Sequence, residues 1–468
     1  MKNILLIEPG AEVTIYPPIG LLHLASVIRD KYKVIIKDFS GKKINEKEIE
    51  NLIIKTNPFI VGVRVLTGPG IPRALLISKI AKRFGKIVVW GGPHPTILPE
   101  QTLENKNIDS VCIGEGEYAL QDLLRYYEGK IKDVPGTGIK ENGEIKIFPP
   151  QKKIVDFNNL PLPSWDLLED IDRYFPDKKH NSLPLSTTRG CAFNCGFCHN
   201  SNKNVKCYLG NYRLAPPERA IEEYKFVRKL IKNKIDILDV GEDLHLISYD
   251  YAKRFCDAIK DSGVKNLKWN TSTRYSMLTE EIVDMIAKYN CKRVLLGVES
   301  GSKRIQNMNG KIIELKHAIK IAKRLRQKKI FVTNAYIFGH PTETTEELKK
   351  TLEFMKKIPA DENLIQLYRP MPATPYFDLC LKEGKINKIP RKLEEWGGFG
   401  VLGHDINVSR IPSEILFSTF YKTNAIEQTK YLFNQQKFYL RENMYSIFIR
   451  NFIQNRFTHK LKEFLVSK

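Results

Sequence analysis

The chain has 468 residues, about three times the length of an average domain, so two or three domains are expected. Its 42% hydrophobic and 27% charged residues are typical of globular proteins and exclude a mainly disordered chain. Lys and Arg number 75 against 53 Asp and Glu, and we interpret the resulting charge of +22, which recurs along the whole chain, mainly as a lysine-rich surface.

The first part of the chain alternates short apolar runs with segments of helical period. The runs predict five strands, at Asn3–Ile7, Val34–Ile36, Phe59–Val65, Ile87–Trp90 and Ser110–Ile113. Apolar positions three and four residues apart predict helices at Leu21–Arg29, Ile71–Arg83 and Tyr118–Tyr127. This alternation predicts a parallel, doubly wound α/β domain over residues 1–135, with any ligand beyond the carboxyl ends of its strands.

A stretch with several prolines and glycines, 136–183, interrupts this rhythm and is expected to be a linker. A second series of strands is predicted at Leu185–Thr188, Ile235–Val240, Leu267–Thr271, Arg293–Val298, Ile330–Phe338 and Leu364–Arg369. Strands that alternate with helices in this way predict a partial (β/α)6 barrel over 184–384, with functional groups on the loops after strand ends. Residues 385–468 are expected to be mostly helical. Their aromatic and basic residues favour a helix packed on another domain over a nucleic-acid platform.

Three cysteines lie close together directly after the first strand of the second series. Cys191, Cys195 and Cys198 share one short loop, whereas structural zinc commonly takes four ligands in two separated pairs. Three ligands favour a cubane iron-sulfur cluster with one iron open to another molecule, because electron-transfer clusters normally have four cysteines. His199 and Cys207 are the alternatives for a fourth ligand, although His199 adjoins Cys198 and could turn inward only with strain in the loop.

With Phe197, the cysteines form a C-x3-C-x-aromatic-C motif that resembles the motif of radical S-adenosylmethionine (SAM) enzymes. The resemblance implies that the three cysteines hold a 4Fe-4S cluster and that SAM binds the fourth iron through its amino and carboxylate groups. It also implies that an electron from the cluster cleaves SAM to methionine and a 5′-deoxyadenosyl radical, which abstracts hydrogen from an unreactive carbon.

Two further motifs of that family follow predicted strands. Val240-Gly241-Glu242 resembles its glycine-glutamate element, with Val240 where a glycine is usual, and the resemblance implies that Glu242 lies near the methionine amino group. Gly297–Gly301 resembles its G-[IV]-E-S-G element, which implies that Glu299 and Ser300 contact the ribose and carboxylate of SAM.

Two other strand ends complete the predicted SAM site. Arg274 follows the third strand, where a cation could hold the methionine carboxylate. Gly339-His340-Pro341 resembles the family's turn on the adenine side, which makes Gly339 a further expected contact. Each element alone could be an ordinary strand-end charge or turn, but their order along the chain favours a single site.

The first domain resembles the Rossmann-like cobalamin-binding domain of one branch of this family. The resemblance rests on Tyr16–Leu21, Trp90–Thr96 and Gly114–Glu117. It implies cobalamin contacts at Gly20, Gly91, Gly92, Gly114 and Glu115, since glycines at strand ends let backbone approach a ligand closely. The alternative is that these glycines only make tight turns.

A histidine ligand to cobalt is not predicted from the usual motif. The loop after the second strand reads Asp38-Phe39-Ser40-Gly41 and lacks the histidine of Asp-x-His-x-x-Gly. His23 and His94 remain outside candidates, although such histidines are more often plain surface or core residues.

The resemblance implies a cobalamin-dependent radical SAM methyltransferase acting on an unactivated carbon or phosphorus centre. The alternatives are a cyclase or rearrangement enzyme of the same branch and, from another class, a non-catalytic iron-sulfur sensor or RNA-binding protein. Methylthiolation is disfavoured because the first domain has only Cys112, without the additional cysteines of methylthiotransferases. No general acid or base is identified.

The expected partners follow from the interpretation as a radical SAM methyltransferase. The substrate is a small molecule or peptide of unknown identity, and the electron comes from a low-potential donor such as flavodoxin or ferredoxin. Nucleic acid is not expected. The chain has no apolar run of the roughly 20 residues that a membrane span needs and no signal-peptide core before Glu8, so a cytoplasmic protein is expected.

Overall fold

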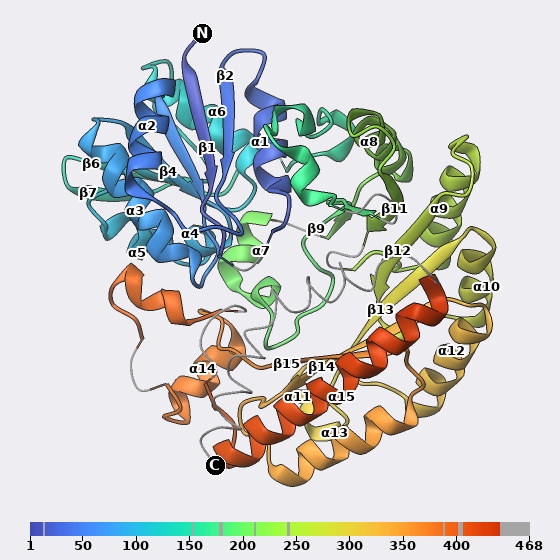
Figure 1. The fold of residues 1–468 in the computed structure, drawn as a ribbon. Helices are drawn as coiled ribbons and strands as arrows, with labels where there is room; N and C mark the ends of the chain where they lie inside the picture. Colours follow the sequence, from blue (N-terminus) through green and yellow to red (C-terminus); the bar gives the residue numbers. More distant parts are fainter. Residues whose placement is uncertain are drawn as a thin grey trace.

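The computed structural model describes residues 1–12, 15–151, 154–176, 181–209, 212–240, 244–386, 389–400 and 406–439. These residues form two α/β units, one after the other along the chain, and a C-terminal segment that contacts both (Figure 1). Within this described part, no helix combines the length and the apolar composition that a membrane span requires.

The first unit is built on a seven-stranded sheet in the order β2-β1-β3-β4-β5-β6-β7. Its strands are β1 (Asn3–Glu8), β2 (Lys33–Asp38), β3 (Ile60–Arg64), β4 (Ile87–Gly91), β5 (Ser110–Cys112), β6 (Thr137–Glu141) and β7 (Glu144–Ile147). The first five are parallel, and β6 and β7 are antiparallel additions at one edge. The predicted parallel α/β fold and its five strands are confirmed.

Helices cover both faces of this sheet. They are α1 (Ile19–Ile28), α2 (Glu46–Thr56), α3 (Gly70–Arg83), α4 (Pro93–Ile97), α5 (Pro99–Glu104) and α6 (Gly116–Tyr127). In β1, Ile4 and Leu6 belong to the core on one face, whereas Leu5 and Ile7 belong to the core on the other. Because neighbouring strand residues point to opposite faces, a strand covered on both sides needs a continuous apolar run.

The linker prediction for 136–183 is wrong at its start, because β6 and β7 lie there and extend the first sheet. Asn142 and Gly143 have φ values of 49° and 84°, which the two-residue turn between these strands requires. The prediction is also wrong at its end, because a strand of the second sheet begins at Asn181. The described segment 154–176 contacts both units, and its Asp166 accepts from Arg29 of α1 at 2.8 Å. Trp165 is fully buried, and its Nε1 donates to Glu223 Oε1 at 2.7 Å.

The second unit is a parallel sheet in the order β15-β14-β13-β12-β11-β8. Its strands are β8 (Asn181–Pro184), β11 (Ile235–Val240), β12 (Lys268–Thr273), β13 (Cys291–Glu299), β14 (Phe331–Phe338) and β15 (Glu362–Leu367). The two end strands, β8 and β15, are not paired with each other among the described residues, so the sheet is an open half-barrel. The predicted partial barrel is confirmed.

The first predicted strand of this unit, Leu185–Thr188, is misplaced. The sheet strand β8 ends at Pro184, and the ladder extends only to Leu185, whose N–H donates to the Asp239 carbonyl at 2.9 Å. The chain then leaves the sheet to form a separate two-stranded ladder, in which β9 (Thr188–Arg189) pairs with β10 (Arg213–Leu214). The two strands of this ladder flank the segment that carries the three cysteines and hold its ends together.

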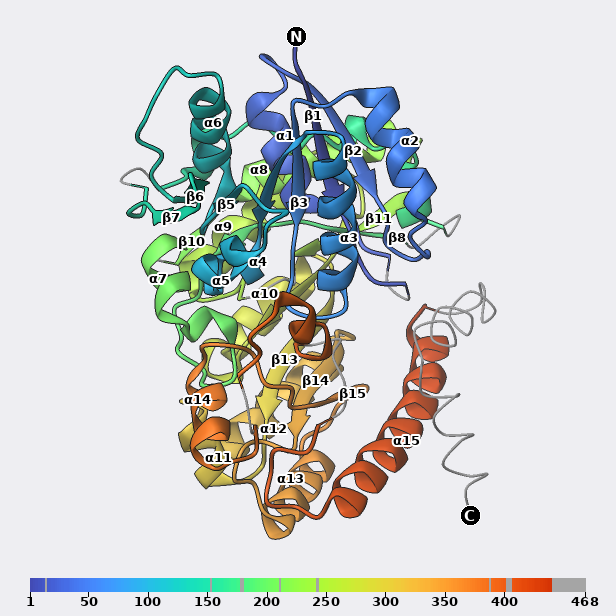
Figure 2. The same ribbon diagram turned by 90° about the vertical axis from the view of Figure 1, so that its left-hand side faces the viewer.

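Helices surround the half-barrel and continue into the C-terminal segment. They are α7 (Lys203–Leu209), α8 (Pro217–Leu230), α9 (Tyr249–Asp261), α10 (Glu280–Lys288), α11 (Lys303–Met308), α12 (Leu315–Gln327), α13 (Thr345–Lys357), α14 (Pro375–Lys382) and α15 (Ser413–Tyr439). In Figure 2, α15 stands beside β15, the edge strand of the half-barrel. Glu427 of α15 accepts from the Asn363 N–H at 3.2 Å, so this helix satisfies a backbone donor on the free edge.

The helical prediction for residues 385–468 is confirmed for α15, and the part beyond Tyr439 lies outside the described residues. A separate short turn, η6 (Leu393–Gly398), packs against α3 of the first unit. Its Trp396 is 1% exposed and donates to Gln101 Oε1 at 2.7 Å.

We expect Phe255→Ala to destabilise the second unit by about 3–5 kcal/mol, because it removes a ring packed 4.9 Å from Trp269 in a fully buried cluster. Urea unfolding followed by tryptophan fluorescence would measure this loss. The matched control is Phe226→Ala, since the Phe226 side chain on α8 is 36% exposed and its loss should cost much less. Equal shifts for the two variants would contradict the core assignment.

Candidate functional site

The three predicted cluster ligands lie on the segment between β9 and β10. Cys195 is buried, Cys191 and Cys198 are half-buried, and the Cys198 N–H donates to the Cys195 carbonyl at 2.9 Å. No three His, Cys, Asp or Glu side chains converge on one metal-ion position in the described part of the chain. In a cubane site each cysteine binds a different iron, and three cysteines on one loop are compatible with such a cluster.

Arg274, predicted to hold the SAM carboxylate, lies against the cysteine segment. Its Nη2 is 2.9 Å from Cys195 Sγ, and its guanidinium carbon is 3.3 Å from the centre of the Phe193 ring. The side chain is only 9% exposed, and the aromatic face holds the cation in place. A buried positive charge at this position stabilises a negatively charged Cys195 thiolate. It would also attract the carboxylate of a SAM molecule bound next to that sulfur.

Glu299, at the carboxyl end of β13, has a strained backbone and a buried partner. Its φ is 67°, a left-handed conformation rare for a residue other than glycine, and a register shift in the sheet precedes it. Its Oε1 accepts from Lys311 Nζ at 2.8 Å, and both side chains are about 10% exposed. A Cβ on Gly297 would lie 2.3 Å from Lys311 Nζ, so a larger residue there would have to displace the ends of the paired side chains. Sequence reasoning missed Lys311, which lies on a loop with no motif of its own.

Ser300, predicted to contact SAM, is engaged within the chain. Its Oγ accepts from the Ser302 N–H at 3.1 Å and lies 3.1 Å from Thr351 Oγ1. The side chain is fully buried, so its hydroxyl shapes the turn after β13. A direct contact of this hydroxyl with SAM stays a prediction. The predicted Glu242 lies outside the described residues.

Gly339 begins a turn that is organised by a buried carboxyl group. Its φ is 79°, and Glu343 Oε2 accepts from the Gly339 and His340 N–H groups at 2.7 and 3.1 Å. Burial raises the pKa of Glu343 to about 8, although these backbone donors oppose the shift. The Glu343 carboxyl is therefore neutral at and below neutral pH.

An aromatic cluster connects this turn to the cysteine segment. The fully buried His340 ring lies between Phe197, Tyr368 and Tyr376, with ring centres 6.0 to 6.4 Å away. Burial lowers the pKa of His340 to about 4, so the ring is neutral near pH 7. A Cβ on Gly196 would lie 2.6 Å from Tyr376, which shows how closely α14 covers the cysteines. These rings exclude water from that side of the cluster site.

A cavity of about 350 Å³ lies where the first unit meets the cysteine segment. It is lined by the carboxyl-end turns of the first sheet and by Ser186, Thr188, Arg189, Gly190, His199 and Asn200. The five predicted cobalamin-contact residues also line it: Gly20, Gly91, Gly92, Gly114 and Glu115. The structure thus brings these residues together beside the cluster segment, and the cavity lies within the roughly 300–1,000 Å³ typical of cofactor sites.

Several cavity residues have contacts of their own. Gly114 has a φ of 83°, and a Cβ there would lie 2.7 Å from the Cβ of Tyr208 on α7, so this glycine permits close packing of the two units. The Glu115 carboxylate accepts from Arg189 at 3.2 Å and from Arg213 at 2.6 Å. A contact of Glu115 with a cofactor stays a prediction.

The two histidines considered as cobalt ligands differ in position. His23 lines the cavity, whereas His94 does not; His94 Nδ1 lies 3.0 Å from Thr67 Oγ1, and its ring meets Trp396 edge-on. Burial lowers the pKa of each to about 3, so both rings are neutral. The Asp38 carboxylate, which begins the loop without histidine, accepts from Tyr174 Oη at 2.5 Å.

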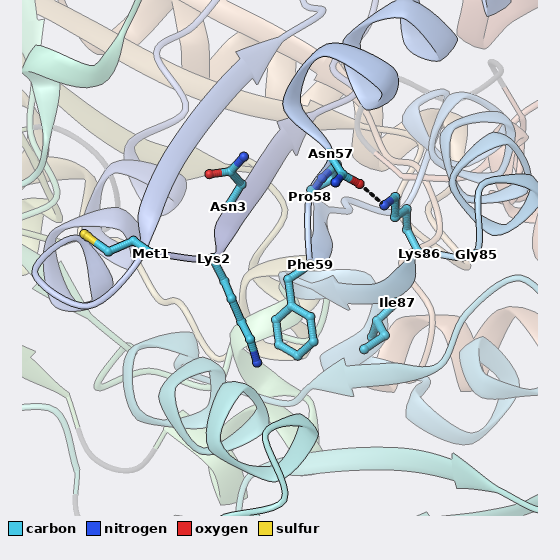
Figure 3. Close-up of a pocket in the computed structure, with 9 residues that line it drawn as sticks. All are labelled: Met1, Lys2, Asn3, Asn57, Pro58, Phe59, Gly85, Lys86 and Ile87. Carbon is cyan, nitrogen blue, oxygen red and sulfur yellow. Dashed lines mark hydrogen bonds between the residues drawn. The ribbon is translucent and has the colours of Figure 1, made fainter.

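A second cavity, of about 500 Å³, lies at the amino ends of strands β1, β3 and β4 (Figure 3). There Lys2 Nζ is 3.9 Å from the centre of the Phe59 ring, and Asn57 accepts from Lys86. No predicted site residue lines this cavity. Because ligands of parallel α/β sheets bind at the carboxyl ends of strands, we place the functional site at the first cavity.

Comparisons with known proteins match both units. A model of the B12 binding domain matches residues 12–124, and a model of the Radical SAM superfamily matches residues 185–355. An uncharacterized methyltransferase of Pyrococcus horikoshii is 32% identical over 396 residues, which cover 81% of this chain and 83% of the relative. A provisionally named methylthiotransferase of Methanocaldococcus jannaschii is 28% identical over 76% of each chain.

Among solved structures, the radical SAM methyltransferase TsrM of Kitasatospora setae, with tryptophan and a SAM analog bound, has a TM-score of 0.68. It is 18% identical, and the match covers 83% of this chain and 78% of that one. The likeness shows that the two chains share a fold.

Glu343→Gln should change the pH dependence of stability. The folded protein holds the Glu343 proton more tightly than the unfolded chain, so this contribution is complete below about pH 4.5 and is lost as the pH rises towards 8. The variant, neutral at every pH, should be more stable than the native protein by about 1–3 kcal/mol above pH 8 and similar to it near pH 5. Denaturant unfolding at a series of pH values measures this difference.

The control for this experiment is Glu346→Gln, because Glu346 is an exposed neighbour three residues along the chain. That variant should follow the native protein across the range. A constant difference between Glu343→Gln and the native protein at all pH values would contradict the assignment.

Proposed function

The chain belongs to the radical SAM superfamily, in the branch with a B12-binding domain, and we propose that it is an enzyme that transfers a methyl group to an unactivated centre of its substrate. Its cofactors are a 4Fe-4S cluster, SAM and cobalamin. When bound, the cluster and SAM supply a carbon radical, and cobalamin carries the methyl group.

The single observation that carries this proposal is the shared wall of the 350 Å³ cavity. Its lining joins glycines at strand ends of the B12-binding domain to residues on both sides of the cysteine triplet, Gly190 and His199. A site for cobalamin there lies next to the cluster segment. Radical formation and methyl transfer need that proximity, because reacting groups must approach within about 3–3.5 Å.

The chain's own charges suit the two ends of the methionine part of SAM. Glu299 and Lys311 form a buried pair of opposite sign at a strand end, and such a pair can exchange its internal partner for the ammonium and carboxylate groups of an amino acid. We assign the ammonium to Glu299 and the carboxylate to Lys311 or to Arg274, whose Nη2 lies 2.9 Å from Cys195 Sγ. The turn at Gly339 offers backbone without a Cβ on the adenine side.

The relative from Methanocaldococcus jannaschii is named as a methylthiotransferase, so methylthiolation is an alternative reaction. Cys112 is the only cysteine before residue 136, and burial raises the pKa of its thiol to about 12. A protonated, buried thiol does not supply the ligands of a second iron-sulfur cluster. This favours methyl transfer.

The proposed function includes a substrate class, an electron donor and a compartment. We expect a small-molecule or peptide substrate and a low-potential donor such as flavodoxin or ferredoxin, for which the +22 charge favours an acidic surface. A reducing compartment, the cytoplasm, suits a chain with eight cysteines, three of them proposed as cluster ligands.

We expect the anaerobically reconstituted protein to convert SAM to 5′-deoxyadenosine under a strong reductant, and Cys195→Ala to abolish this conversion. The matched control is Cys207→Ala, because Cys207 is exposed and lies on α7 of the same segment. Liquid chromatography of the nucleosides and the iron content of each variant would be measured. Loss of the cluster in Cys207→Ala would show a fourth cysteine ligand and contradict the three-cysteine site.

Methyl transfer is tested by the second product of SAM. With cobalamin and reductant, we expect about one S-adenosylhomocysteine per bound cobalamin even without substrate, because the methyl group leaves SAM before it reaches the substrate. A cyclase or rearrangement enzyme would form 5′-deoxyadenosine without S-adenosylhomocysteine. Failure to bind cobalamin, measured by visible absorbance, would contradict the proposal.

A further inference from the structure

Two arginines stand at the two ends of the segment that carries the cysteines. Arg189 ends β9, two residues before Cys191, and Arg213 begins β10; the two are direct partners in the antiparallel ladder. The two ends of the cysteine segment therefore lie side by side, with one arginine at each end. Neither arginine belongs to the predicted contacts of a cofactor.

Both arginines bind the same turn of the B12-binding domain. Arg189 Nη2 lies 2.6 Å from Glu117 Oε1, and its Nη1 lies 3.2 Å from Glu115 Oε1. Arg213 Nη2 lies 2.6 Å from the same Glu115 oxygen, and its Nη1 donates to the Val155 carbonyl at 2.6 Å. We call Arg189, Arg213, Glu115 and Glu117 the arginine clasp.

The carboxylates of the arginine clasp are buried, unlike those of a surface ion pair. The side chains of Glu115 and Glu117 are 7% and 3% exposed. Burial alone would raise the pKa of Glu117, but the Arg189 guanidinium lowers it to about 2, so the carboxylate stays charged throughout the neutral range. Removal of one partner would leave a buried charge uncompensated. The intact ion pairs are therefore strongly favoured over separated side chains.

The arginine clasp also forms part of the cavity wall. Arg189, Glu115 and Glu117 line the cavity together with the glycines at the strand ends of the first sheet. The side chains that fasten the cysteine segment are thus the ones that face a cofactor of the first unit. Any change in their pairing would shift the cluster segment relative to that cavity.

We infer that Arg189 is a positioning residue, which acts through Glu115 and Glu117 to set the separation between the cluster and the cobalamin cavity. This inference rests on the proposed function, because it needs both cofactors. The reaction is sensitive to that separation, since a misplacement of about 1 Å between reacting groups can cost about 10²-fold in rate.

Pulsed electron paramagnetic resonance on the protein loaded with cob(II)alamin and the reduced cluster measures the separation directly, from the dipolar coupling of the two spins. The native protein should give one narrow distance distribution. Arg189→Gln should broaden or shift the distribution in the fraction that holds both cofactors, and Arg189→Lys, which keeps the charge but not the fork, should be intermediate. A merely structural role would lower the yield of loaded protein without changing the distance.

Two further variants keep the test decisive. Glu115→Gln replaces the acceptor that both arginines share with a neutral side chain of the same shape, and it serves where Arg189→Gln does not fold. Arg293→Gln is the control, because Arg293 forms a comparable pair with Glu362, 2.7 Å long, at the other end of the half-barrel. It should reproduce the native distribution.

Native distances in both Arg189→Gln and Glu115→Gln would overturn the inference. If the native protein itself binds no cobalamin or gives no cluster signal, the proposed function fails instead, so the two failures are distinguishable.

Discussion

The ion pairs between the Glu115–Glu117 turn and the two arginines, Arg189 and Arg213, fix the geometry on which the remaining site depends. Each α/β unit alone places its functional residues at the carboxyl ends of parallel strands, as the topology of such sheets dictates. Only the contact between the units turns two separate strand-end sites into one. The buried carboxylates make that contact directional, because a planar guanidinium accepts few orientations relative to its partners.

The charged groups of the site have partners within the chain. Arg274 lies on a sulfur and an aromatic face, and Glu299 is neutralised by Lys311. Buried charges without partners are costly. These partners compensate the charges within the chain, and a ligand group of like charge can replace a partner. The positive φ of Glu299 is a strained conformation, which the surrounding packing must stabilise. This conformation sets the direction of the carboxylate.

Local patterns were sufficient for most of the fold, and they also suggest the cluster ligands, which stay a prediction. The apolar runs of β1 to β5 and the spacing of Cys191, Cys195 and Cys198 are properties of short segments, which sequence reasoning can reach. The hairpin at Asn142-Gly143 was also readable, since Asn-Gly is a strong turn signal, but the surrounding prolines led to its interpretation as a linker.

The missed residues depend on contacts between distant segments. Lys311 meets Glu299 across a loop and a helix, and Arg189 meets Glu117 from 72 positions away. Nothing in the local sequence of either residue specifies its partner. For Ser300 the motif suggests a ligand contact, whereas the structure shows its hydroxyl engaged within a buried turn, so that contact stays a prediction.

We propose that three cysteines anchor the cluster and leave one iron for SAM. Electron-nuclear double resonance on the reduced cluster, with SAM labelled with 15N at the amino group and 17O at the carboxylate, tests it most directly. We expect hyperfine coupling of both labels to the cluster. Absence of both couplings, with a protein side chain bound to the fourth iron or zinc in place of the cluster, would contradict it.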